Sequence, residues 1–167
     1  GMPLAARPAA ALVGVCDDVV LAGRAVAGVA GRVVTDEPGA EGPLAGLVAG
    51  LRAAQRDVCV VAGCDMPALD PGVVGLLLEA LADGAVDAAV CARAGGELEL
   101  LPLVIRASAA VALGGVLSAG DRSLRDGLAA VRTAIVPAAA WSALDPEGRT
   151  FESWNRPADI RPMTAQS

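Results

Sequence analysis

The sequence predicts an α/β domain, in which a three-layer, mostly parallel sheet carries helices on both of its faces. Three observations predict this class. Short apolar runs that are typical of strands alternate with longer amphipathic runs that are typical of helices. Loops rich in glycine, proline and aspartate separate these runs. The chain has 167 residues, of which 54% are apolar, and this is enough to form one domain around one core.

The first half of the chain begins with a helical run and continues with strand-like runs. Residues 3–16 favour a helix, which begins late if Pro8 interrupts it, and two short strands follow at 18–21 and 32–35. A helix over 42–55 would place four apolar side chains on one face: Leu44, Leu47, Val48 and Leu51. The uninterrupted apolar run 57–62 predicts a central parallel strand that is buried on both faces.

The second half continues the alternation. A helix is predicted over 71–81, with Asp70 as its N-cap and Pro71 at its first position. Residues 97–105 alternate in polarity and predict an antiparallel excursion that turns at Gly95 and Gly96. The remaining expected elements are strands at 86–91 and 133–136, helices at 107–117 and 123–131, a strand-like piece at 150–154 and a short helix at 157–161.

The composition excludes several classes of site and partner. The chain has no histidine and no lysine, so it can form neither a Ser-His catalytic pair nor a Walker A lysine site. Its net charge of −6 makes nucleic acid and anionic membranes poor partners. No apolar run reaches the roughly 20 residues that a bilayer requires, and no signal peptide is evident, so we expect a cytoplasmic protein. The cysteines are expected to be buried, reduced thiols: Cys16, Cys59, Cys64 and Cys91.

Asp65 is the strongest candidate for a functional residue. It lies just after the apolar run 57–62, and the loops at the carboxyl ends of strands are where ligands bind in α/β sheets. A carboxylate at that edge suits Mg²⁺, which proteins usually bind through one or two carboxylates together with substrate phosphates. The structural alternative is a helix-capping aspartate, but Asp70 already serves as that cap.

Three further loops could hold a ligand, although each also has an ordinary structural interpretation. Asp36 precedes a predicted helix and the segment 42–46 begins it, and the free N–H groups at a helix start can bind an anion; an ordinary loop entering a helix fits these residues as well. Arg122 and Ser123 combine a phosphate-binding side chain with a hydroxyl at a helix start, or they form a solvated capping loop. Asn155 is either a neutral metal or phosphate ligand or a helix N-cap.

Taken together, these segments resemble the molybdenum cofactor guanylyltransferases, which are MobA-like nucleotidyltransferases. The matching stretches include the sequence GPLAGL within 36–51 and the tetrapeptide CDMP within 60–71. Three more matching stretches follow in the order of the family, at 101–108, 120–128 and 151–160. The resemblance covers nearly the whole chain, and it implies one domain over 1–167 with a Rossmann-like sheet of the nucleotide-diphospho-sugar-transferase type.

The resemblance also implies a function and a set of site residues. Members of this family join GMP from GTP to molybdopterin with Mg²⁺ and release pyrophosphate. Asp65 resembles the metal-binding, catalytic aspartate, and Asn155 resembles a polar residue near the metal. The nucleotide pocket would include Asp36, Gly42, Pro43, Leu44, Ala45 and Gly46. Pro102, Arg122 and Ser123 would face the pterin substrate.

The chain departs from the family pattern at its start. The family opens with a strand and a Gly-rich loop that supplies an arginine and a lysine, whereas Gly1 resembles the position just after that loop. A late start site, a fragment and an inactive nucleotide-binding relative all fit this departure. A related transferase that uses CTP or another phosphorylated acceptor is a further alternative. Without the first strand we expect an exposed gap in the sheet, which pairing with another copy could fill in a homo-oligomer.

Overall fold

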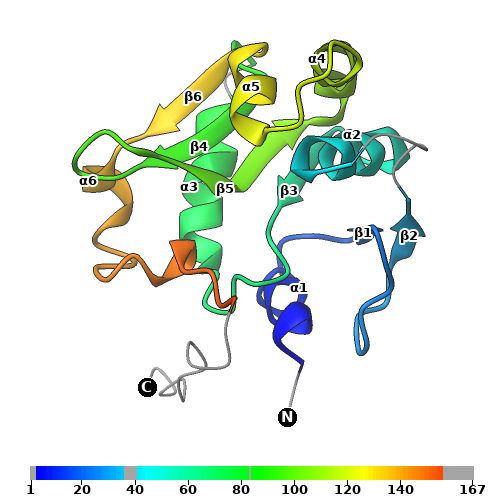
Figure 1. Ribbon diagram of the computed structural model, residues 1–167. Coiled ribbons are helices and arrows are strands. Elements are labelled where there is room, and N and C mark those ends of the chain that lie inside the picture. The colour runs from blue at the N-terminus through cyan, green and yellow to red at the C-terminus, as the bar shows by residue number, and fades with distance from the viewer. Residues whose placement is uncertain (1–2, 36–40, 83, 156–167) are drawn as a thin grey trace.

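A four-stranded mixed sheet forms the centre of the computed structural model, which describes residues 3–35, 41–82 and 84–155. Its strands are β3 (Val58–Val61), β5 (Leu98–Arg106), β4 (Ala88–Ala92) and β6 (Thr133–Val136), in this spatial order. β5 runs antiparallel to both of its neighbours, and β4 and β6 are parallel. A separate parallel pair, β1 (Val20–Ala22) and β2 (Arg32–Val34), lies beside the second helix (Figure 1).

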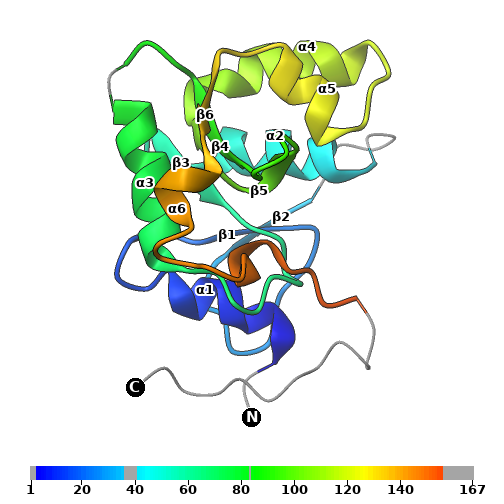
Figure 2. The same ribbon diagram turned by 90° about the vertical axis from the view of Figure 1, so that its left-hand side faces the viewer.

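Helices cover both faces of the four-stranded sheet, as Figure 2 shows. One face packs against α2 (Pro43–Ala53), α4 (Ala110–Ser118) and α5 (Leu124–Ala129). The other face packs against α3 (Pro71–Ala82) and α6 (Ala138–Trp141). The helix α1 (Arg7–Ala11) follows a single 3-10 turn at Leu4–Ala6. This three-layer arrangement confirms the predicted α/β class.

The alternation of side chains along β4 divides the core into two halves. All five residues of this strand are buried. Ala88 and Val90 pack with α2, α4 and α5, whereas Ala89 and Cys91 pack with α3, because successive side chains on a strand point to opposite faces. The buried positions of α2 include the four predicted residues of its apolar face. Both halves of the core therefore follow from the hydrophobic periodicity.

The position predicted for the run 57–62 is wrong. β3 lies at the edge of the four-stranded sheet, pairs antiparallel with β5, and exposes Val58. The central, fully buried strand is β4. Burial of an apolar run depends on its neighbours in space, and an edge strand shielded by helices has the same composition as a central one. The sheet is also mixed rather than mostly parallel, because β5 runs antiparallel to both β3 and β4. The antiparallel excursion at β5 was predicted correctly.

β3 has one unpaired edge in the described part of the chain. β1 and β2 pair only with each other, and no described strand pairs with β3 on the side away from β5. The ion pair of Arg56 with Asp17, at 2.6 Å, links the segment before β3 to the segment before β1. A second ion pair, of Arg32 with Asp18 at 2.6 Å, joins β2 to the segment before β1. Among the described helices, none is long and apolar enough to cross a bilayer.

Several other predictions are confirmed or corrected. The carboxylate of Asp70 caps α3 by accepting hydrogen bonds from Gly72 N at 2.7 Å and Val73 N at 3.3 Å, as predicted. The strand-like piece at 150–154 begins instead with a 3-10 turn, Arg149–Phe151, and α6 was not predicted. The expected helix at 157–161 lies outside the described residues. The cysteines are all free thiols, but only Cys91 is fully buried and Cys64 is exposed, which corrects the expectation of four buried thiols.

Candidate functional site

Asp65 lies in the loop after β3, at the carboxyl end of the strand, as predicted. The loop closes through a hydrogen bond from Met66 N to Gly63 O at 3.3 Å, and Met66 and Pro67 are buried beneath it. A Cβ atom on Gly63 would overlap Oδ1 of Asp65. Glycine at position 63 therefore leaves room for the half-buried Asp65 carboxylate to fold back over the end of the strand.

The segment after the last 3-10 turn holds Asp65 in place from the far end of the sequence. The backbone N–H of Trp154 donates to Asp65 O at 2.9 Å. The Ser153 hydroxyl donates to Asp65 Oδ2, and Nδ2 of Asn155 donates to Ser153 Oγ at 2.7 Å. Residues i and i+2 of an extended segment lie on the same side, so both polar side chains face the same loop. The structure thus brings Asp65 and Asn155 together and adds Ser153, which the sequence reasoning missed.

Aromatic packing and backbone hydrogen bonds fix this segment. Trp141 and Phe151 meet edge to face with their ring centroids 4.9 Å apart, and Trp141 Nε1 donates to Ala92 O at 3.1 Å. Thr150 is fully buried, donates its N–H to the Asp145 carboxylate at 2.7 Å, and accepts a hydrogen bond at Oγ1 from Asp70 N at 3.2 Å. The segment is therefore anchored to β4 and to the start of α3.

A cavity of about 230 Å³ opens beside Asp65. Asp65 and Ser153 form one polar part of its wall, and a second carboxylate, on Glu99, forms another. The other lining residues are Met66, Leu100, Leu101, Leu124 and Phe151. Glu99, Leu124 and Phe151 were not predicted as site residues, since nothing in their local sequence separates them from core or surface positions. The cavity lies at the carboxyl ends of β3 and β4, where ligands bind in α/β sheets.

The predicted nucleotide segment 42–46 begins α2. Gly42 has φ +106°, a conformation that other residues rarely adopt, and a Cβ there would lie 3.4 Å from Cβ of Arg122. Leu44 N donates to Arg122 O at 3.2 Å, so the two predicted loops are in contact. The side chain of Leu44 is fully buried. The backbone of Leu44 is therefore the part that a ligand could reach, and contact of this residue with a nucleotide stays a prediction.

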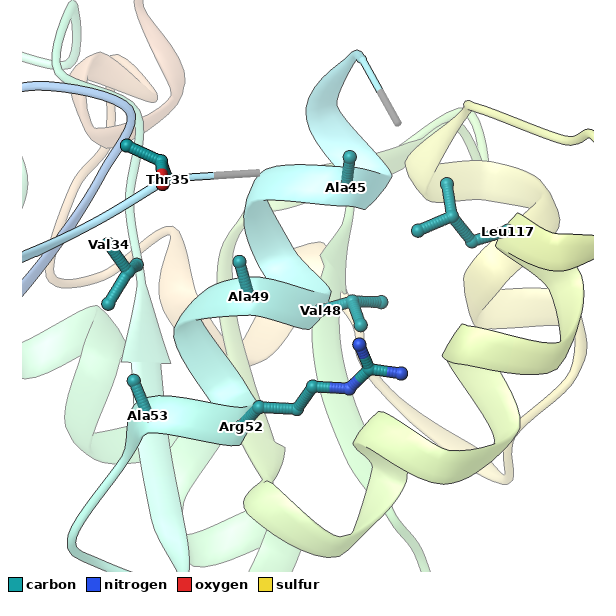
Figure 3. Close-up of a pocket in the computed structure, with 8 residues that line it drawn as sticks. All are labelled: Val34, Thr35, Ala45, Val48, Ala49, Arg52, Ala53 and Leu117. Atoms are coloured by element: carbon teal, nitrogen blue, oxygen red, sulfur yellow. The ribbon is translucent and has the colours of Figure 1, made fainter. Parts of the chain in front are cut away.

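Ala45 lines a different cavity, of about 300 Å³, between β2, α2 and α4. Figure 3 shows that the Arg52 side chain extends from α2 across this cavity towards α4. A Cβ on Gly114 of α4 would lie 3.1 Å from Nη2 of Arg52, so the helix backbone approaches the guanidinium closely. Thr35 lies at the rim and directly precedes Asp36, which lies outside the described residues. Of the predicted nucleotide residues, Ala45 lines this cavity, which does not include Asp65.

The residues predicted to face the second substrate have structural roles as well. Ser123 caps α5 by accepting a hydrogen bond from Asp126 N at 3.1 Å, and the guanidinium of Arg122 donates to Leu117 O at 2.9 Å. Pro102 is buried, and its neighbour Leu101 lines the cavity of Asp65 instead. These contacts agree with the capping interpretation of the 120–123 loop, and contact with a substrate stays a prediction.

The donor set around Asp65 suits a hard divalent cation. It consists of a carboxylate, a hydroxyl and a side-chain amide, which offer the oxygen atoms that Mg²⁺ prefers. Within the described ranges, no three acidic or thiol side chains gather into a metal cluster. Asp65 is therefore the residue that could hold such an ion, with Asn155 beside it.

Comparison with known proteins identifies clear relatives. A family described as MobA-like NTP transferase domain matches residues 1–135. A probable molybdenum cofactor guanylyltransferase from Chloroflexus aggregans is 29% identical over 136 residues, which are 80% of this chain and 64% of that protein. A molybdenum cofactor guanylyltransferase from Burkholderia vietnamiensis is 33% identical over 138 residues, which are 75% of this chain and 67% of that protein.

A solved structure shares the fold. The molybdopterin-guanine dinucleotide biosynthesis protein A from Archaeoglobus fulgidus superposes with a TM-score of 0.66 and is 27% identical. The match covers 77% of this chain and 64% of that one. The chain spans between about half and two thirds of the length of the curated relatives that it matches.

Proposed function

The chain belongs to the MobA-like NTP transferase family, and from this premise we propose that it is a nucleotidyltransferase that moves GMP from GTP to molybdopterin with Mg²⁺. The relatives named as molybdenum cofactor guanylyltransferases support the choice of nucleotide and acceptor. The observation that carries the proposal is the Asp65 loop, where Ser153 holds the carboxylate, Trp154 N–H holds the backbone carbonyl, and Asp65 lines a cavity.

Asp65 would hold the Mg²⁺ ion, and Asn155 would lie next to it. When bound, the ion neutralises negative charge on the triphosphate. Ser153 keeps the carboxylate in one orientation, and Gly63 leaves room for it. The protein's own contribution is therefore a fixed anionic ligand, which requires no rearrangement when the substrates arrive.

The transfer exchanges one bond to phosphorus for another. An oxygen of the acceptor's phosphate attacks the α-phosphorus of GTP, and the bond from this phosphorus to the bridging oxygen breaks. The electron pair of the broken bond leaves with pyrophosphate. Because the acceptor's phosphate is already ionised at neutral pH, no side chain has to remove a proton from it. The residues around the cavity act by positioning the two substrates.

Calorimetric titration of Mg²⁺·GTP and Mg²⁺·CTP into three proteins tests the proposal: wild type, Asp65→Asn, and the control Glu79→Gln, which changes an exposed carboxylate on α3. We expect GTP to bind wild type and the control equally. We expect binding to Asp65→Asn to be at least tenfold weaker, with an unchanged circular dichroism spectrum. Binding of CTP alone would assign a different nucleotide. A folded wild type that binds neither nucleotide would overturn the proposal.

A further inference from the structure

The cavity of Asp65 contains a second carboxylate, on Glu99, that the proposed transfer does not use. Glu99 lies on β5 opposite Cys91 of β4, and its side chain is 22% exposed. Arg93, just after β4, donates from Nε to Glu99 Oε1. The described residues donate no hydrogen bond to Oε2 of Glu99. One carboxylate oxygen that lines the cavity therefore keeps its full capacity to accept.

Arg93 is itself fixed in place. Its guanidinium carbon lies 5.4 Å from the centroid of the Phe151 ring, a distance that suits a cation–π contact. A Cβ on Gly148 would lie 3.1 Å from Nη1 of Arg93, so the loop backbone closes over the guanidinium. The backbone of Arg93 is also held, by hydrogen bonds with Glu97 O and Gly96 N at 2.8 Å. A fixed cation thus compensates the charge of Glu99 and orients its carboxylate.

Apart from the two carboxylates and Ser153, the cavity wall is apolar. Its apolar lining includes Leu100, Leu101, Leu124 and Phe151. Apolar walls accommodate the faces of a planar ring, and a carboxylate at the edge of such a ring accepts hydrogen bonds from adjacent N–H donors. A ring N–H beside an exocyclic amine provides such a pair. This is the 2-amino-pyrimidinone edge, which guanine and pterins share.

We propose that Glu99 is a specificity-determining residue that binds the 2-amino-pyrimidinone edge of the pterin acceptor. The inference rests on the proposed function. Two observations favour the acceptor ring over guanine. Glu99 shares its cavity with Asp65, and Ala45, of the predicted nucleotide segment, lines the other cavity. Arg93 already neutralises Glu99, which leaves Asp65 as the carboxylate for the cation and Glu99 as the acceptor of neutral donors.

Two pairs of probes separate the sources of this edge. Neopterin carries the exocyclic amine, and the matching lumazine, a pteridine-2,4-dione, has an oxygen in its place. GTP and ITP differ by the same amine on the purine. Affinities for the pterins are measured by fluorescence titration and those for the nucleotides by calorimetry. The proteins are wild type, Glu99→Gln and the control Glu97→Gln, an exposed carboxylate outside the cavity lining.

We expect wild type and the control to bind neopterin at least tenfold more tightly than the lumazine. Glu99→Gln should bind neopterin about tenfold more weakly and lose the preference, because its one oxygen would pair with Arg93 and its NH₂ group, a donor, would take the place of Oε2. Its affinities for GTP and for Mn²⁺, used as a spectroscopic substitute for Mg²⁺, should not change. If Glu99→Gln does not fold, Glu99→Asp replaces it. The shorter side chain withdraws the carboxylate by one methylene, and we expect the same loss of the preference for neopterin over the lumazine.

Four results would overturn the inference. A neopterin preference that survives in the Glu99 variant would remove the role of this residue and leave the proposed function intact. Loss of the preference for GTP over ITP would assign Glu99 to the nucleotide, and loss of Mn²⁺ affinity would assign it to the metal. A folded wild type that binds neither GTP nor neopterin would overturn the proposed function, and the inference with it.

Discussion

Gly127 in α5 sets how closely this helix approaches α2, and its replacement by alanine should destabilise the protein. A Cβ at this position would lie 2.6 Å from Cδ1 of Leu44 and 3.2 Å from Cδ2 of Leu113. Carbon atoms normally pack about 3.5–4.0 Å apart, so Leu44 would have to move by roughly 1 Å. Both leucines are fully buried, which leaves them no space to move into.

The expected magnitude follows from two opposing effects. Overpacking of a close-packed core costs about 1–3 kcal/mol. Replacing a helical glycine by alanine contributes about 0.5–1 kcal/mol in the opposite direction, because the unfolded chain loses conformational freedom. We therefore expect Gly127→Ala to lower the free energy of unfolding by about 1 kcal/mol, and by roughly 2.5 kcal/mol at most.

Gly75→Ala in α3 provides the matched control. A Cβ on Gly75 would have no heavy atom within 4 Å, so only the helix effect applies. This variant should gain about 0.5–1 kcal/mol. Urea unfolding, followed by the fluorescence of the buried Trp141 and Trp154, measures both variants against wild type. A Gly127→Ala protein as stable as Gly75→Ala would refute the packing argument.

Two further predictions concern the site loop and a buried thiol. Ser153→Ala should weaken Mn²⁺ binding about tenfold, since it frees the Asp65 carboxylate while the Trp154 backbone contact persists. Ser153→Thr keeps a hydroxyl and should restore the affinity. Equal Mn²⁺ affinities of wild type and Ser153→Ala would contradict this role of Ser153. Burial raises the pKa of Cys91 to about 11. The free energy of unfolding should therefore fall as pH rises from about 9.0 towards 11, because Cys91 loses its proton in the unfolded chain before it does so in the folded protein. At pH 8, iodoacetamide should label the exposed Cys64 and spare Cys91, as checked by mass spectrometry; rapid labelling of Cys91 would contradict this.

Local sequence patterns predicted the helices and their buried faces well. The period of apolar residues in α2 identifies the four residues that pack against the sheet, and Asp70 and Pro71 mark the start of α3. These features depend on interactions between residues three or four positions apart, so they can be derived from neighbouring positions alone. The turn at Gly95 and Gly96 belongs to the same class, since it needs only local backbone freedom.

The site could be predicted only in part. Asp65 was proposed because it follows a strand. Asn155 was proposed because it follows the strand-like piece 150–154 and resembles a polar residue of the family near the metal. Ser153 and Glu99 carry no local signal, and their relation to Asp65 depends on contacts between segments far apart in the chain. The hydrogen bond between Ser153 and Asp65, for example, spans 88 positions. Leu44 lies in the core, as its place in the apolar period predicted, and its contact with a nucleotide stays a prediction.

The sequence by itself determined the α/β class, the two apolar faces of the core, and the place of a carboxylate after a strand. Periodicity and turn chemistry encode these features locally. The tertiary structure alone decided that β3 lies at an edge, that the sheet is mixed, and that Ser153 and Glu99 share a cavity with Asp65. Strand order and side-chain encounters depend on the packing of distant segments, and an apolar run has the same composition wherever in the sheet it is placed.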